Sequence, residues 1–169
     1  MFTIVNITCG VLAIYFITSG QFFIAASLAW IGGAFDIFDG KIARKYNLSS
    51  EFGIQLDSSA DFISFVLVPV MFIFYGVVVN NDPNLYISAI IIIYYVISAL
   101  RRLINFNINS NEGEVSKYFT GVPTPLGAIL LWITYLGFAY GLYSHYLVAL
   151  GVMGVVGYLL NSKVKIRHP

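Results

Sequence analysis

The sequence predicts an all-α integral membrane bundle of six transmembrane helices, in one domain over residues 1–169. The composition, the length of the apolar segments and the placement of the basic residues support this class. Hydrophobic residues make up 59% of the chain and charged residues only 10%, and the mean hydropathy is +0.83. Soluble domains carry about 25% charged residues. The composition therefore excludes an ordinary soluble domain and favours a chain surrounded by lipid.

Six apolar stretches are close to the length of about 20 residues that a helix needs to cross the hydrocarbon of a bilayer. In chain order they cover residues 1–18, 21–45, 52–79, 84–107, 122–141 and 144–162. Polar, turn-forming residues separate them, at residues 18–21, 47–51, 80–84, 107–121 and 141–144. We expect one helix in each stretch.

Individual stretches carry further signals. The first has no basic leader and no small-residue cleavage site, so we expect a retained helix rather than a signal peptide. Pro123 and Pro125 favour the start of the fifth helix. In the sixth helix, Gly151, Gly154 and Gly157 form a stripe of small residues that would let another helix approach closely.

The basic residues predict the orientation. If six helices cross the membrane, all nine lysines and arginines lie on the same side of it. The breaks on the other side, near residues 18–21, 79–85 and 141–144, contain none. Because cytoplasmic loops carry the excess of basic residues, we expect a multi-pass protein of the cell membrane with both termini in the cytoplasm.

Four aspartates lie inside or at the ends of apolar stretches. Asp36 and Asp39 are three residues apart, and Asp57 and Asp61 are four apart, so each pair shares one face of a helix. The polar break between the pairs lets the two helices run antiparallel, which would bring the pairs face to face on the cytoplasmic side. A charged side chain near the middle of a membrane helix costs roughly 2.5–3.5 kcal/mol. Divalent cations would offset this cost.

An oxygen-only ligand set without cysteine or histidine suits Mg²⁺, Mn²⁺ or Ca²⁺ better than zinc. We expect two ions, because four carboxylates around one ion would leave excess negative charge, and paired metals suit phosphoryl transfer. Gly40, Ala43 and Gly53 carry little or no side chain, so a ligand could approach the helix backbone there.

From Asp36 to Asp61 the chain reads D-x-x-D-G-x-x-A-R, eight residues, then G-x-x-x-D-x-x-x-D. This pattern resembles the signature of the CDP-alcohol phosphotransferase family at every defined position. The resemblance implies six transmembrane helices and a homodimer. It also implies transfer of a phosphatidyl group from a CDP-linked lipid, CDP-diacylglycerol or CDP-archaeol, to an alcohol, with release of CMP.

The resemblance also implies a role for each residue of the motif. Asp36, Asp39 and Asp57 would be metal ligands, and Asp61 would be both a metal ligand and the general base. The CDP-binding surface would be formed by Asp36, Asp39, Gly40, Ala43, Arg44, Gly53 and Asp57.

Two further stretches are similar to the phosphatidylserine synthase subfamily, which implies L-serine as the acceptor. In residues 3–10, Thr3 and Asn6 would contact CDP. The second stretch covers residues 102–107 and 119–125, and it has Asn105 where the subfamily usually has arginine. The candidates for binding the acceptor carboxylate or a phosphate are Arg101, Arg102, Asn105 and Lys117.

Other functions fit parts of the pattern. Glycerol phosphate or inositol phosphate as acceptor would attract the same arginines. Intramembrane acids also mark metal-ion and proton transporters, although transporters commonly repeat such features in two halves, and here the acid cluster occurs once. A purely structural membrane protein would leave the buried charges unexplained. Membrane lipids and a second copy are the expected partners, and with a net charge of +1 no nucleic acid is expected.

Overall fold

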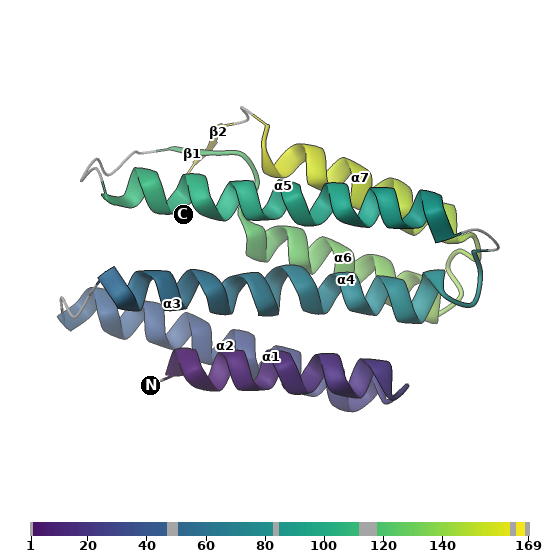
Figure 1. Cartoon of the computed structure of the whole chain (residues 1–169), viewed down its shortest axis with the longest axis horizontal. Helices are drawn as coiled ribbons and strands as arrows, with labels where there is room; N and C mark the ends of the chain where they lie inside the picture. The colour runs from purple at the N-terminus through teal and green to yellow at the C-terminus, as the bar shows by residue number, and fades with distance from the viewer. Residues whose placement is uncertain (1, 47–50, 83–84, 112–117, 163–164, 168–169) are drawn as a thin grey trace. The chain divides into compact units, whose positions relative to one another are not determined.

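The computed structural model describes residues 2–46, 51–82, 85–111, 118–162 and 165–167, and these are almost entirely helical (Figure 1). The helices are α1 (Phe2–Thr18), α2 (Phe22–Tyr46), α3 (Glu51–Asp61), the π-helical stretch η1 (Phe62–Leu67), α4 (Val68–Ile73), a second π-helical stretch η2 (Phe74–Val78), α5 (Leu85–Asn111), α6 (Thr124–Ala139) and α7 (Tyr146–Leu160). Two strands, β1 (Tyr118–Thr120) and β2 (Lys165–Arg167), complete the described part.

The predicted helical class is confirmed, because each of the six apolar stretches contains one helical segment. The third segment is one continuous helix from Glu51 to Val78 that passes twice through π-helical geometry. The sequence did not predict the strands. They pair antiparallel, with Tyr118 opposite Arg167 and Thr120 opposite Lys165. Three-residue strands are too short to show a repeating apolar pattern.

The chain divides into two compact units, residues 1–71 and 72–169. In the first unit, α1 and α2 lie side by side (Figure 1). A tight turn at Gly20 joins them, and its backbone φ of +75° is one that glycine adopts without strain. The next two helical segments, α3 and η1, both pack on α1. The first unit is therefore built around α1.

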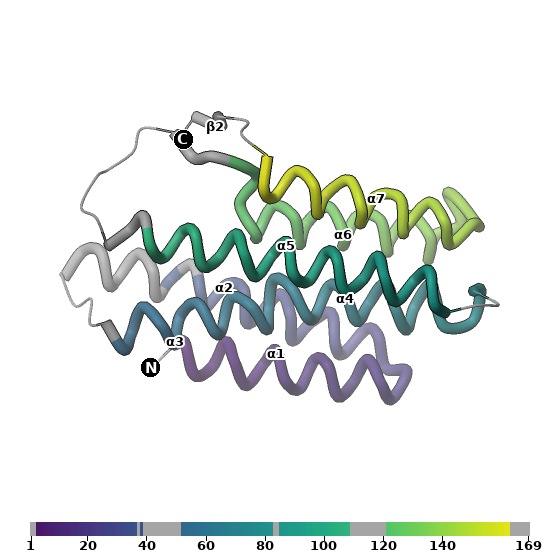
Figure 2. Tube along the Cα trace, turned by 45° about the horizontal axis from the view of Figure 1, so that its top comes forward, coloured from purple at the N-terminus to yellow at the C-terminus, as the bar shows by residue number. Residues whose placement is uncertain are grey.

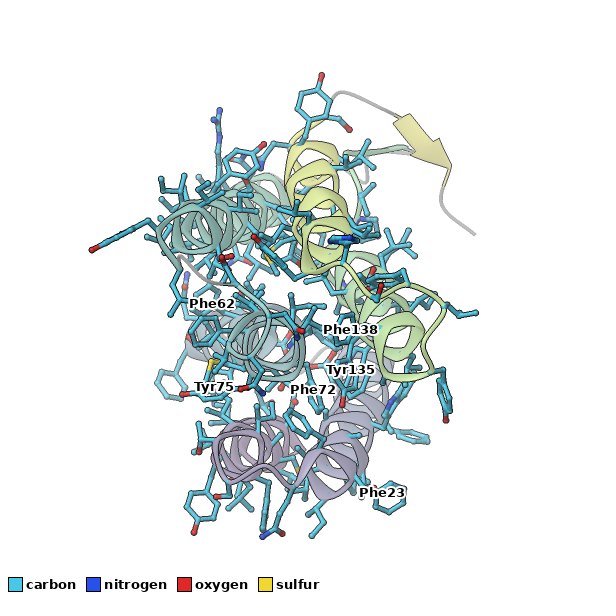
Figure 3. The ribbon with its side chains drawn as sticks, turned by 90° about the vertical axis from the view of Figure 1, so that its right-hand side faces the viewer. Phe23, Phe62, Phe72, Tyr75, Tyr135 and Phe138 are labelled. Carbon is cyan, nitrogen blue, oxygen red and sulfur yellow. The ribbon has the colours of Figure 1, made fainter. Side chains whose placement is uncertain are left out.

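In the second unit, α7 packs on both α5 and α6 (Figure 2). Phe72 packs on two aromatic residues of α6. Its ring centroid lies 5.1 Å from that of Tyr135 (Figure 3) and 4.3 Å from that of Trp132. Asn161, just after α7, donates a hydrogen bond from Nδ2 to the carbonyl of Ser98 in α5 at 2.8 Å. These contacts hold the three helices of the unit together.

The glycine stripe of the last helix serves packing at one of its three positions. A Cβ on Gly157 would lie 2.9 Å from the ring of Tyr94, so α5 and α7 approach closely there. By contrast, a Cβ on Gly151 or Gly154 would meet no atom of the described residues within 4 Å.

Among the described residues, two helices, Phe52–Val78 and Leu85–Ile108, are long and apolar enough to cross a membrane by length and composition. Four apolar helices are shorter, and the 15 residues of α7 rise by about 22 Å, against about 30 Å of bilayer hydrocarbon. Large apolar side chains are exposed along one face of α5, with Ile90, Ile93 and Ile97 each more than half exposed. Lipid suits such a face better than water does. These features favour a membrane protein.

Gly121 offers a test of the packing in the second unit. Its φ is +84°, and a Cβ there would lie 2.5 Å from the carbonyl oxygen of Leu160. Gly141 is the matched control, because its φ is +73° and a Cβ would meet nothing described within 4 Å. Gly141→Ala should cost about 1–2 kcal/mol for the left-handed backbone alone, and Gly121→Ala should cost clearly more. Thermal unfolding in detergent would measure both, and equal shifts of the midpoint would contradict the contact with Leu160.

Candidate active site

Three of the four aspartates lie in described positions, and all three belong to the first unit. Asp36 is in α2, and Asp57 and Asp61 are in α3. Asp61 shares a side-chain hydrogen bond with Asp36, and Asp57 lies close enough for its charge to act on Asp61. All three side chains are half-buried. The two helices therefore present carboxyl groups to each other.

The fourth aspartate, Asp39, lies on α2, but its side chain is outside the part of the structure that is described. Among the described side chains, no group of three or more histidines, cysteines or carboxylates is arranged to hold a metal ion. The quartet predicted from the sequence thus stays a prediction, and the contact between Asp36 and Asp61 is the part of it that the structure displays.

The chemistry of the described carboxyl groups suits a hard divalent cation. Two ionised carboxylates in hydrogen-bonding contact repel each other unless a proton or a cation lies between them. The contact between Asp36 and Asp61 is of this kind, and the charge of Asp57 adds to the repulsion. Carboxylate oxygens at a partly buried position are ligands that magnesium, manganese and calcium accept.

Asp36 is held by a residue of another helix. Asn6 of α1 donates a hydrogen bond from Nδ2 to Oδ1 of Asp36 at 3.0 Å. The other end of the same amide accepts a hydrogen bond from the Ser64 hydroxyl of η1, with 2.6 Å between Ser64 Oγ and Asn6 Oδ1. Asn6 is 0% exposed. The three side chains form a continuous chain of hydrogen bonds from η1 through α1 to α2.

Two glycines make this chain possible. A Cβ on Gly32 of α2 would lie 3.1 Å from Asn6 Oδ1. A Cβ on Gly10 of α1 would lie 3.0 Å from Ser64 Oγ and 2.7 Å from Cγ2 of Ile63. Side chains at these positions would occupy the space that the hydrogen-bonded groups use. The absence of a Cβ thus lets α1 approach both α2 and η1.

The residues predicted to bind CDP are placed in part. Gly40, Ala43 and Arg44 belong to the last turns of α2, and nothing of their side chains is described. Gly53 is exposed in α3, and Thr3 is half-buried in α1. A direct contact between Asn6 and a nucleotide would require this buried residue to become exposed, so its hydrogen bonds favour an internal role instead.

The residues predicted for the acceptor belong to the second unit. Three of them lie on α5, where the helical turn places Arg101 and Asn105 on a different side from Arg102. Arg101 and Asn105, four residues apart, are both exposed. Arg102 is only 8% exposed, and its Nε donates a hydrogen bond to the carbonyl of Val122 at 3.3 Å. Lys117 lies outside the described residues. The structure therefore does not gather these candidates on one face of the helix.

Ser64 is a residue that the sequence reasoning missed. A signal was available, because Ser64 follows Asp61 by three residues and Asp57 by seven, the spacing of one helix face. The π-helical stretch η1 begins directly after Asp61 and changes the direction of the side chains that follow. Such π-helical segments are frequent at functional sites.

Comparisons with known proteins agree with the motif. The family model for CDP-alcohol phosphatidyltransferases matches residues 1–158. The chain is 35% identical to the CDP-diacylglycerol–serine O-phosphatidyltransferase of Bacillus subtilis, over 99% of this chain and 88% of that protein. Enzymes with the same name are 32% identical in Helicobacter pylori, over 98% of this chain and 73% of that protein, and 35% identical in Methanocaldococcus jannaschii, over 96% and 70%.

Substitution of Gly10 tests whether close helix packing supports the site. Gly10→Ala forces the new methyl against Ile63 and Ser64, and overpacking of this kind costs about 1–3 kcal/mol. Gly151→Ala is the control, because its Cβ would meet nothing within 4 Å in the described structure and alanine favours a helix by up to about 1 kcal/mol. We expect a lower unfolding midpoint for Gly10→Ala and an unchanged or higher one for Gly151→Ala. The same midpoint for both variants would show that α1 and η1 do not pack closely at Gly10.

Proposed function

Because the chain belongs to the CDP-alcohol phosphatidyltransferase family, we propose that it transfers a phosphatidyl group from CDP-diacylglycerol, or from CDP-archaeol, to the hydroxyl of L-serine. The products are phosphatidylserine and CMP. The observation that carries the proposal is the contact between Asp36 and Asp61 across two helices, with Asp57 beside it. The choice of serine rests on the names of the relatives.

We assign the binding of two divalent cations, Mg²⁺ or Mn²⁺ with Ca²⁺ as a third option, to Asp36, Asp39, Asp57 and Asp61. When bound, such ions supply positive charge that holds a diphosphate and stabilises the charge on the leaving phosphate. The support is the set of carboxyl groups around Asp61, where Asp36 is hydrogen-bonded to it and the charge of Asp57 acts on it.

Asp61 is the proposed general base. The serine hydroxyl oxygen forms a bond to the phosphorus of the phosphatidyl group, and Asp61 accepts the proton that the hydroxyl loses. The bond from that phosphorus to the oxygen of CMP breaks, and CMP leaves with the electron pair. General-base assistance contributes roughly 10²–10⁴ in rate. Asp61 suits this task because it is half-buried and hydrogen-bonded to a second carboxyl that can share a proton.

For the nucleotide we retain Gly40, Ala43, Arg44, Gly53 and Thr3, on the strength of the family motif. For the serine carboxylate we retain Arg101, Arg102, Asn105 and Lys117. Arg101 and Asn105 are exposed and accessible to a ligand, whereas Arg102 is buried and its Nε donates to the carbonyl of Val122.

We also propose six transmembrane helices with the aspartates and both termini on the cytoplasmic side, and a homodimer. Support for the topology comes from the two long apolar helices among the described residues and from the absence of lysine and arginine near residues 18–21, 79–85 and 141–144, the breaks expected on the side opposite the cytoplasm. A single domain of the family would then cover both compact units.

Asp61→Asn tests the base. The amide keeps the size of the side chain but cannot accept the proton, so the rate of CMP release should fall by roughly 10²–10⁴, while CDP-lipid binding largely survives. The measurements are CMP release and equilibrium binding of CDP-diacylglycerol by the purified protein in detergent. Ser59→Ala is a control on the same helix, because the hydroxyl of this exposed residue donates to the carbonyl of Gln55 in that helix. Turnover at the native rate in Asp61→Asn would exclude Asp61 as the base.

Removal of divalent metal tests the reaction class. With a chelator present, CMP release from CDP-diacylglycerol and serine should stop, and added Mg²⁺ or Mn²⁺ should restore it.

Replacing serine by glycerol phosphate or inositol phosphate in the restored assay tests the acceptor. Faster turnover with a phosphorylated polyol would replace serine in the proposal. Metal flux into vesicles without CMP release would favour a transporter.

A further inference from the structure

Asn6 is fully buried, and both ends of its amide group are used inside the protein. Nδ2 donates to Asp36 Oδ1 at 3.0 Å, and Oδ1 accepts from Ser64 Oγ at 2.6 Å. These bonds join three helical segments of the first unit that are far apart in the sequence. They end on a carboxyl group of the proposed metal site.

The chemistry of the three groups fixes the direction of the amide. In the ionised form that would bind a cation, the Asp36 carboxylate only accepts hydrogen bonds, so the Nδ2 group of Asn6 faces it. The Oδ1 atom then faces Ser64, whose hydroxyl can donate. If the amide turned over, two acceptors would face each other at Asp36. Ser64 therefore holds the Oδ1 end of the Asn6 amide, and the Nδ2 end holds Asp36.

We propose that Asn6 and Ser64 are positioning residues that hold Asp36 ready to bind a divalent cation. The inference rests on the proposed function, in which Asp36 is a metal ligand. Carboxylates that bind metals are themselves held by hydrogen bonds, and loss of such a partner typically lowers metal affinity or activity by about 10–100-fold. This role differs from a direct contact between Asn6 and the nucleotide.

The close packing around the pair agrees with a positioning role. Gly32 and Gly10 would each bring a Cβ to about 3 Å from the oxygen of Asn6 or of Ser64. The side chains thus have little room to turn. A carboxyl group held in this way keeps its direction before the cation arrives, so less ordering is needed on binding.

The variants are Ser64→Ala, which removes one hydrogen bond, and Asn6→Leu, which keeps the approximate shape but removes both. Thr8→Val and Ser59→Ala are matched controls from the same helices. The Thr8 hydroxyl bonds the carbonyl of Ile4 and the Ser59 hydroxyl that of Gln55, both at exposed positions. Each variant is purified as the full chain in detergent, and thermal unfolding shows that it is folded.

The probe is Mn²⁺ alone, with the bound fraction measured by electron paramagnetic resonance. We expect the dissociation constant for Mn²⁺ to rise about 10–100-fold in Asn6→Leu and less in Ser64→Ala, with both controls unchanged. In the CMP-release assay, excess Mn²⁺ should restore most of the rate of Ser64→Ala, because the defect lies in metal affinity.

Folded variants that bind Mn²⁺ as tightly as the native protein would overturn the proposal. If Asn6→Leu does not fold, Ser64→Ala decides alone. Weakened Mn²⁺ binding in the variants, together with no CMP release by the native protein from any CDP-lipid, would leave the positioning role standing and reject the proposed function. A native protein that does not bind Mn²⁺ would reject both.

Discussion

The first unit is organised by the need to keep several carboxyl groups close together in an apolar setting. Asp36 and Asp61 share a hydrogen bond, and Asp57 adds a third negative charge nearby. Repulsion between such groups would push α2 and α3 apart unless something held them. The amide of Asn6 provides one part of that hold, since it donates to Asp36 from a third helix. Cations would supply the remainder in the proposed function.

Small residues let the helices that carry these carboxyl groups pack closely. In a membrane, helices associate without the hydrophobic effect that drives them together in water, so close backbone approach and hydrogen bonds gain importance. Gly10 and Gly32 permit that approach where α1 meets η1 and α2. The hydrogen bonds of Asn6 form in the space they leave. Packing and chemistry in this unit thus depend on the same few positions.

The sequence predicted the helices well because long apolar runs between turn residues are a strong local signal. Of the two facing aspartate pairs that it predicted, the structure displays the contact between Asp36 and Asp61, with Asp57 nearby. The sequence could not predict the π-helical stretches or the pairing of β1 with β2, which depend on contacts between distant segments. The sequence also could not predict which polar side chains are buried. The family motif indicated Asn6 as a CDP-binding residue, and the sequence did not distinguish Arg101 from Arg102. Helix packing buries Asn6 and Arg102.

The residues proposed for the two substrates fall in different parts of the chain. Those assigned to the metal and the CDP-lipid all belong to residues 1–71, whereas Arg101, Arg102 and Asn105 belong to residues 72–169. None of the hydrogen bonds that hold Asp36 through Asn6 and Ser64 involves α5. In the proposed function, a change on α5, such as asparagine at position 105, would therefore alter acceptor recognition and leave the support of Asp36 intact. In the proposed function, this separation would let one family signature serve different acceptor alcohols.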